Sequence, residues 1–128
     1  GGRLDFLVDV TMHAAAALAM GVTASRIDGG RSALAGLVAA AGIVLSAVCA
    51  RWLSAPRPTA DGTVVAILRT LGTRDGFYLV LAAFVLARMF APTLLPVLVG
   101  LLAIGSQGFW LTCLVERLTT RGRSPGAP

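Results

Sequence analysis

Residues 1–22, with the sequence GGRLDFLVDVTMHAAAALAMGV, decide how the rest of the chain is interpreted. The stretch is apolar enough to open a membrane-spanning helix, yet it carries Asp5, Asp9 and His13. Residues four apart lie on one face of an α-helix, with Cβ atoms about 6 Å apart. These three residues therefore form a polar line along an otherwise apolar helix, and we call Asp5, Asp9 and His13 the polar stripe.

The polar stripe is a candidate metal site. Ionisable groups in a membrane segment are costly, and they usually face a bundle interior or a wet cavity. Two carboxylates one turn apart suit a hard cation such as Mg²⁺ or Mn²⁺, which takes oxygen ligands. The alternative is that Asp5 only complements the positive end of the helix dipole, an effect confined to the first turn. Because Asp9 and His13 lie deeper, the pattern favours Asp5 and Asp9 as metal ligands.

The composition excludes an ordinary soluble protein. Of the 128 residues, 56% are hydrophobic and 13% are charged, whereas soluble domains have about 25% charged residues. The mean hydropathy of +0.82 is typical of a polytopic membrane protein. The net charge of +5 comes from Arg residues that flank apolar segments, as the positive-inside rule expects. The expected partner is therefore a lipid bilayer and not a nucleic acid.

The apolar segments predict an all-α integral membrane protein, a bundle of about four transmembrane helices within residues 1–118. The four helices are expected at about 5–22, 32–53, 76–91 and 93–115, with Pro92 making a tight turn between the last two. A short helix lying on the membrane surface is expected at about 63–71, with a partly ordered loop as the alternative. Residues 119–128 are expected to form a disordered tail.

Small residues in two helices indicate close helix packing. The second apolar segment carries a small-xxx-small face, and the last one carries three glycines. Small residues let helix backbones approach closely in membranes. The faces are Ala35, Gly36, Ala39 and Ala40 in the second segment, and Gly100, Gly105 and Gly108 in the last. We expect helix contacts there, and a homodimer is one form that they can take.

The Arg residues predict which side of the membrane carries the polar stripe. Eight Arg residues lie on the side of the N-terminal edge, and three lie at or near the other side. This bias places the polar stripe on the cytoplasmic side. On that side the metal site would face Arg69 and Arg74. This arrangement would suit the binding of phosphate groups, because a metal ion and Arg together neutralise phosphoryl charge. The eight are Arg3, Arg51, Arg57, Arg69, Arg74, Arg117, Arg121 and Arg123, and the three are Arg26, Arg31 and Arg88.

Gly1-x3-Asp5-x3-Asp9 resembles the second half of the CDP-alcohol phosphatidyltransferase signature. That signature reads Asp-x2-Asp-Gly-x2-Ala-Arg, a spacer, and then Gly-x3-Asp-x3-Asp. Arg74-Asp75 and Gly108-Phe109-Trp110 also resemble the later part of such proteins. The family has six membrane helices with the two half-motifs on the second and third, so the resemblance implies that this chain corresponds to the last four. The first half-motif is absent here, and we therefore expect the chain to be a fragment of a longer enzyme.

The resemblance implies a metal-dependent transferase of phospholipid biosynthesis. Such an enzyme moves a phosphatidyl (substituted phosphate) group from a CDP-linked donor to an alcohol acceptor and releases CMP. Asp5 would be a metal ligand, and Asp9 a ligand or the general base, with Mg²⁺ or Mn²⁺ as the cofactor. Gly1 would allow close approach of a helix or nucleotide. His13 has no place in the signature, and it either supports a ligand or is simply packed.

Two other interpretations stay open. A membrane prenyltransferase also binds Mg²⁺ through Asp-rich helices, although no second Asp-rich motif is visible in this sequence. A non-catalytic scaffold would use the polar stripe for hydrogen bonds between helices, and it would tolerate Asn at Asp5 and Asp9. The acceptor also stays open among glycerol phosphate, inositol or its phosphate, and serine. The expected location is a bacterial inner membrane, with the active site on the cytoplasmic side.

Overall fold

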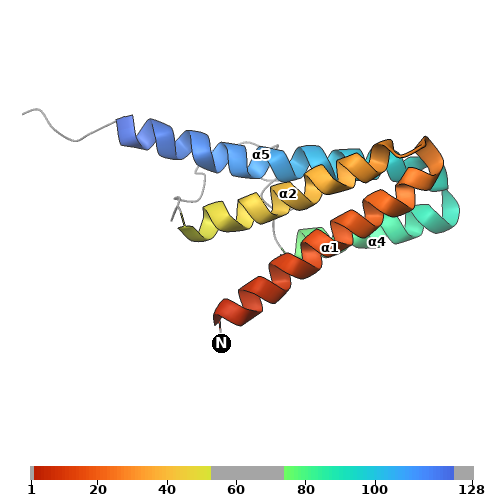
Figure 1. Cartoon of the computed structure of the whole chain (residues 1–128), viewed down its shortest axis with the longest axis horizontal. Helices are drawn as coiled ribbons and strands as arrows, with labels where there is room; N and C mark the ends of the chain where they lie inside the picture. Colours follow the sequence, from red (N-terminus) through yellow and green to blue (C-terminus); the bar gives the residue numbers. More distant parts are fainter. Residues whose placement is uncertain (1, 53–73, 123–128) are drawn as a thin grey trace, which may run out of the picture.

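The computed structural model describes residues 2–52 and 74–122, and these residues are almost entirely helical. No β-strand occurs within these two ranges, so the predicted all-α class is confirmed for them. With the labels of Figure 1, the elements are α1 (Gly2–Asp28), α2 (Arg31–Trp52), α4 (Arg74–Phe90), the 3-10 helix η1 (Pro92–Leu94) and α5 (Leu95–Gly122).

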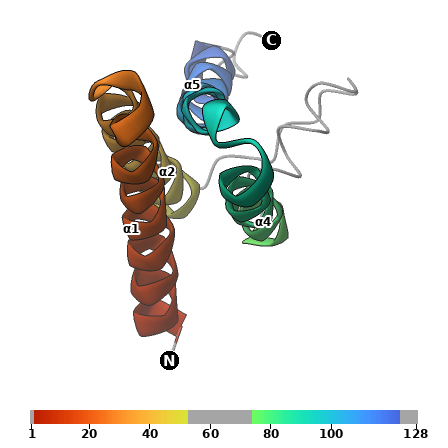
Figure 2. The ribbon, with the colours of Figure 1, turned by 90° about the vertical axis from the view of Figure 1, so that its right-hand side faces the viewer.

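The helices form two antiparallel hairpins that lie side by side. Figure 2 separates them, with α1 and α2 on one side and α4 and α5 on the other. Helix α2 packs against both α1 and α5. In Figure 1 both hairpin turns lie at the right, whereas the start of α1 and the ends of α2 and α5 lie toward the left. We call these the turn end and the open end of the bundle.

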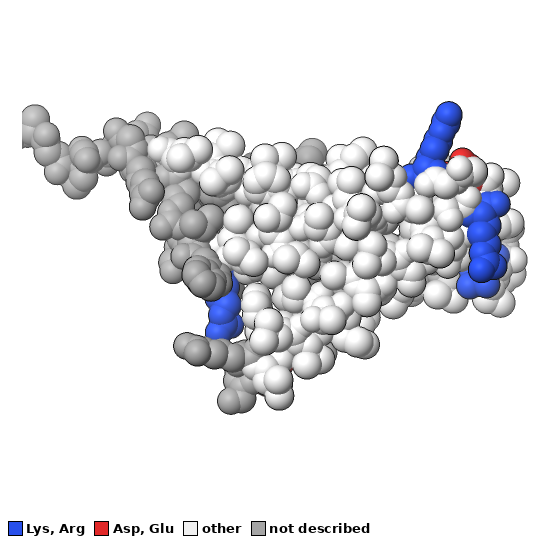
Figure 3. Space-filling view, in the orientation of Figure 1, with Lys and Arg blue, Asp and Glu red and all other residues white. Residues whose placement is uncertain are grey.

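Within residues 2–52 and 74–122, three helical segments are long and apolar enough to cross a membrane: Leu4–Asp28, Arg31–Cys49 and Pro92–Thr112. The apolar part of α4, Gly76–Phe90, is shorter than the roughly 20 residues of a full crossing. The structure therefore has three full-length candidates and one short helix, where the sequence predicted about four spans. Figure 3 shows the distribution of charge on one face, where Arg side chains lie at the two ends and an uncharged surface separates them.

The observed helix bounds differ from the predicted ones mainly at the C-terminal ends of α1 and α5. Helix α1 continues to Asp28, and not to about Val22, because Gly21 is packed within the helix and no Pro occurs before Gly29, where φ becomes positive. Helix α5 continues to Gly122, so residues 119–122 are helical and not part of a tail. The expected surface helix at 63–71 and the rest of the tail at 123–128 lie outside the described residues.

The turn between α1 and α2 is made by two glycines. Gly29 and Gly30 have φ values of 68° and 105°, a region that side chains other than Gly rarely adopt. The Asp28 carboxylate then accepts hydrogen bonds from the backbone N–H of Ser32 at 3.2 Å and from its hydroxyl at 2.5 Å. These bonds satisfy free donors at the start of α2, as a capping side chain does.

The closest helix crossing pairs Gly21 of α1 with Gly36 of α2. A Cβ atom added to Gly21 would lie 2.6 Å from the Gly36 Cα, and one added to Gly36 would lie 2.7 Å from the Gly21 Cα. The two backbones are therefore in direct contact, as small residues permit. The predicted small-residue face on α2 thus packs inside the chain, where Ala39 and Ala40 are also buried.

Helix α5 approaches α2 at a glycine that the sequence analysis did not single out. A Cβ added to Gly42 would lie 2.4 Å from the Ser106 hydroxyl oxygen. In contrast, a Cβ added to Gly100, Gly105 or Gly108 would meet no described atom within 4 Å. Within the described part of the chain, the glycines of α5 do not mark a close contact, and the close contact uses a glycine of α2.

The apolar core lies on both sides of the Gly21–Gly36 crossing. One cluster joins three helices and consists of Met20 and Ala24 of α1, Phe84 of α4, and Leu95 and Val99 of α5. A second cluster, nearer the middle, consists of alanines from three helices. Both clusters use the C-terminal half of α1, so the N-terminal half of α1 with the polar stripe lies outside the core.

Candidate functional site

The polar stripe continues the buried face of α1 beyond the core. Ala17, Met20 and Ala24 are almost fully buried, and stepping back from them by three or four residues reaches His13 and Asp9. Both are partly buried, whereas Leu7 and Met12 on other faces are 61% and 67% exposed. Polar groups therefore occupy the inward positions of the N-terminal half of α1. Asp5, one turn further, is exposed at the open end.

His13 is held against the backbone of its own helix. Its Nδ1 atom lies 2.6 Å from the backbone carbonyl oxygen of Asp9 and 3.8 Å from the Asp9 carboxylate oxygen Oδ1. Because a carbonyl oxygen can only accept, Nδ1 must carry the proton and donate it in this bond. The His13 side chain is only 12% exposed, and that of Asp9 is 41% exposed. The carboxylate therefore remains accessible, while the imidazole is enclosed.

The imidazole of His13 also contacts α4. Its ring centroid lies 4.2 Å from that of Phe77 and 5.9 Å from that of Tyr78, with both pairs tilted. Phe77 is 8% exposed and lies in the first turn of α4, which begins at Arg74. The contact therefore brings the start of α4 to the polar stripe.

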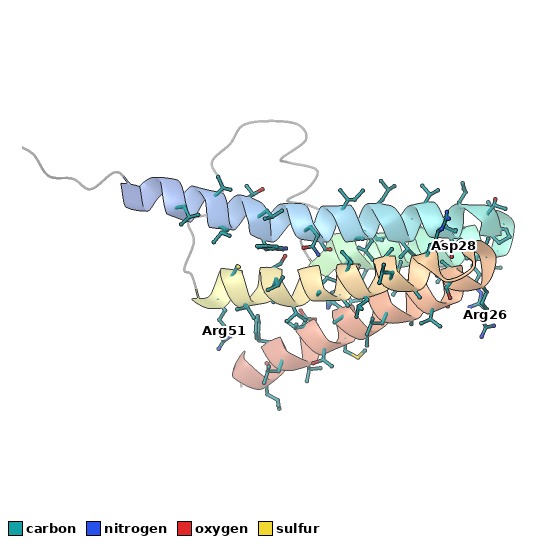
Figure 4. The ribbon with its side chains drawn as sticks, turned by 45° about the horizontal axis from the view of Figure 1, so that its top comes forward. Arg26, Asp28 and Arg51 are labelled. Atoms are coloured by element: carbon teal, nitrogen blue, oxygen red, sulfur yellow. The ribbon has the colours of Figure 1, made fainter. Side chains whose placement is uncertain are left out.

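Arg51 is a cation of the open end that the sequence analysis did not assign to the site. Its guanidinium carbon lies 4.7 Å from the ring centroid of Phe6, the residue directly after Asp5. Figure 4 shows Arg51 at the end of α2, with Arg26 and Asp28 at the opposite end of the bundle. Finding this contact requires the register of α1 on α2, which the Gly21–Gly36 crossing sets and no single-segment pattern reveals.

The donor set fits a metal ion that shares its coordination with a substrate. Within the described ranges, no three His, Cys, Asp or Glu side chains gather as a metal-binding cluster. Mg²⁺ commonly keeps several waters and takes only one or two protein carboxylates together with substrate phosphates. Asp5 is exposed and Asp9 is partly exposed, so both carboxylates can reach such an ion. This set suits an open Mg²⁺ or Mn²⁺ site and not a closed structural one.

The structure places only some of the predicted site residues. It brings together Asp5, Asp9 and His13 on α1, and it adds the first turn of α4, in which Arg74 is the first residue. The backbone of Arg74 is described, but its side chain is not. Gly1 and Arg69 lie outside the described residues.

A second polar cluster between α2 and α5 has a different character. The Gln107 amide nitrogen donates to the Val38 carbonyl at 2.8 Å, and its oxygen accepts from the Trp110 indole at 2.6 Å. The Ser46 hydroxyl donates to the Ser106 carbonyl at 3.3 Å. These groups bond to each other and to backbone, so they join two helices. They form the α2–α5 clamp, a structural feature.

No family model, curated protein or solved structure matches this chain. The assignment of a function therefore starts from the residues of the site and from the arrangement of the helices.

Proposed function

We propose that this protein is a metal-dependent membrane transferase that moves a phosphatidyl (substituted phosphate) group from a CDP-linked donor to an alcohol, with release of CMP. The observation that carries the proposal is the pair Asp5 and Asp9. These accessible carboxylates lie one turn apart, Asp9 partly buried and Asp5 exposed, on a helix that is apolar enough to cross a membrane. An ionisable pair at such a position is costly, and it is usually kept for function.

The bundle spans the bilayer with its open end on the cytoplasmic side. The antiparallel hairpins of Figure 1 support this orientation, because they bring the start of α1 and the ends of α2 and α5 to one end. Within the described residues, the helix ends that meet there carry Arg3, Arg51, Arg117 and Arg121, and the positive-inside rule expects an excess of Arg on a cytoplasmic side. The polar stripe then lies where a water-soluble acceptor and a lipid-linked donor can meet.

The chemistry assigns tasks to three residues. Asp5 and Asp9 would hold Mg²⁺ or Mn²⁺, and the bound ion would offset negative charge on the phosphates. Asp9 also accepts the proton of the acceptor hydroxyl as a general base. The hydroxyl oxygen forms a bond to the β-phosphorus of the donor, and the bond from that phosphorus to the CMP oxygen breaks. Arg74, at the start of α4, supplies positive charge to a phosphate.

The proposal is tested by measuring CMP release in liposomes from the protein expressed from its whole open reading frame. The reaction contains CDP-diacylglycerol, Mg²⁺ and, in separate assays, glycerol 3-phosphate, inositol 1-phosphate or serine. Asp9→Asn should lower the rate by at least about 100-fold, because a general base contributes about 10²–10⁴-fold. The matched control is Asp28→Asn, the same substitution at the turn end, and it should keep the rate. Absence of CMP with every acceptor, or equal rates for Asp9→Asn and the unsubstituted chain, contradicts the proposal.

The scaffold interpretation is the second candidate, and one observation favours it. His13 bonds to backbone and packs on Phe77, as a residue that only joins helices would. A scaffold predicts that Asn at Asp5 and Asp9 changes neither the fold nor any metal binding. The prenyltransferase interpretation has no comparable support, because no second Asp-rich motif is visible in the sequence.

A further inference from the structure

His13 contacts both sides of the proposed site. On one side its Nδ1 atom donates to the Asp9 carbonyl at 2.6 Å and lies 3.8 Å from the Asp9 carboxylate. On the other side its ring packs on Phe77 of α4, with the centroids 4.2 Å apart. One enclosed side chain thus touches the residue assigned as base and metal ligand, and also the helix whose first residue is Arg74.

We propose that His13 is a positioning residue that fixes the Asp9 carboxylate and holds the first turn of α4 against the polar stripe. This inference rests on the proposed function, because it concerns the same site. It assigns to His13 two separable tasks, one for the Nδ1–H group and one for the face of the ring. It gives His13 no contact with the substrate.

The first task concerns the conformation of Asp9. Within α1 the Asp9 carbonyl accepts the backbone N–H four residues later, and a carbonyl oxygen has two lone pairs, so it can also accept the bond from the His13 ring. This bond holds the imidazole flat against the helix beside the Asp9 carboxylate. The ring then occupies one side of the carboxylate and restricts its rotamers. Groups that orient a metal ligand in this way typically change metal affinity by about 10–100-fold when they are lost.

The second task concerns α4. Phe77 lies three residues after Arg74, so both belong to the first turn of the helix. The contact between His13 and Phe77 therefore fixes how far the start of α4 lies from Asp9. Tilted aromatic pairs of this kind are favoured at centroid distances of about 4.5–7 Å, and the pair here is slightly closer. Removing the ring should free the start of α4 to move away from α1.

Two substitutions separate the two tasks. His13→Phe keeps a ring against Phe77 and removes the Nδ1 donor. His13→Asn keeps an N–H donor within reach of the Asp9 carbonyl and removes the ring. The matched control is Met12→Phe, which adds the same ring at the neighbouring position, where the side chain is 67% exposed.

Two measurements read out the two tasks in detergent micelles. The affinity for Mn²⁺ is measured from the electron paramagnetic resonance signal of free Mn²⁺, without any substrate. The distance between α1 and α4 is measured by dipolar spectroscopy between spin labels at Ala15→Cys and Leu79→Cys. Both label positions are exposed. The native cysteines, Cys49 and Cys113, are first replaced by Ser.

The expected results differ between the two variants. His13→Phe should bind Mn²⁺ about tenfold more weakly at an unchanged label distance. His13→Asn should keep most of the Mn²⁺ affinity, since it restores the donor, and it should broaden the label distances. Met12→Phe should change neither quantity. A residue that is merely packed would not give this opposite pattern.

The outcomes also separate this inference from the proposed function. If the unsubstituted chain binds Mn²⁺ and both His13 variants match it in affinity and label distance, the inference is overturned and the proposed function stands. If the unsubstituted chain binds no more Mn²⁺ than the Asp5→Asn, Asp9→Asn double variant, the proposed function fails. In that case the positioning of a metal ligand by His13 fails with it.

Discussion

The two halves of α1 use the same inward face in opposite ways. In the C-terminal half, Ala17, Met20 and Ala24 are buried in the core, and Gly21 touches the backbone of α2. In the N-terminal half, the same face presents Asp9 and His13. The inward face of the C-terminal half is lined by apolar side chains, whereas the N-terminal half places the partly buried Asp9 and His13 on that face.

The difference indicates that the C-terminal half of α1 stabilises the bundle, whereas the N-terminal half carries the candidate metal ligands. Lipid tails are as apolar as side chains, so helices in a membrane associate through close packing and hydrogen bonds. The Gly21–Gly36 crossing and the α2–α5 clamp supply both. The polar half of α1 is then free to hold groups that would weaken a core. Substitutions in the two halves should therefore separate stability from metal binding.

The largest loss of stability is expected from Gly21→Ala. The new Cβ would lie 2.6 Å from the Gly36 Cα, and only a shift of one helix can relieve the clash. Overpacking of this kind costs about 1–3 kcal/mol. The measurement is unfolding in mixed micelles of dodecyl sulfate and maltoside, followed by circular dichroism.

The matched control for that variant is Gly100→Ala, because a Cβ at Gly100 meets no described atom within 4 Å. It gains the helix propensity of Ala, about 1 kcal/mol, without a clash. Equal stabilities of the two variants would show that the α1–α2 crossing is not a tight contact.

A smaller loss is expected from Gln107→Leu in the α2–α5 clamp. The substitution removes the bond to the Val38 carbonyl and leaves the Trp110 indole without its acceptor. Hydrogen bonds between membrane helices contribute about 0.6 kcal/mol on average and up to about 1.7, and the same unfolding assay should show a loss of that size. The control is Thr112→Val, which removes a hydrogen bond within α5 only and should leave the stability nearly unchanged. A loss of stability as large as that of Gln107→Leu would show that the α2–α5 clamp has no special role.

The smallest effect is expected from Arg51→Gln at the open end. The variant loses the contact between the guanidinium and the Phe6 ring, which contributes about 0.5–1 kcal/mol at an exposed site. Arg26→Gln, at the turn end in Figure 4, is the control. If Arg51→Gln lost more stability than Gln107→Leu, the open end would also stabilise the fold, and stability would not be confined to the C-terminal half of α1 and its contacts.

The sequence was sufficient to predict the helical class and the turn at Pro92, because apolar runs and a helix-breaking residue are local signals. The small-residue face around Gly36 was also correctly predicted as a packing surface. Its partner Gly21 was not, and neither was the contact of Gly42 with α5. A periodic pattern shows which side of a helix can pack, but the partner depends on the rotation and register of two helices.

The candidate site was partly predictable for the same reason. The spacing of Asp5, Asp9 and His13 within one helix placed them on one face without any tertiary information. The ring partner of His13 and the position of Arg51 beside Phe6 required the packed structure. The sequence left open whether His13 supports a ligand or is packed, and the structure shows that its ring contacts α4.

The most direct test of the central claim is Mn²⁺ binding by the chain with Asn at both Asp5 and Asp9. Amides keep the shape and much of the hydrogen bonding of the carboxylates, so the helices should pack as before. We predict that the double variant keeps its unfolding curve and binds Mn²⁺ at least about 100-fold more weakly, a larger loss than that for groups that only orient ligands. Asp28→Asn should bind normally. Equal Mn²⁺ binding by the double variant and the unsubstituted chain would contradict the claim and favour the scaffold.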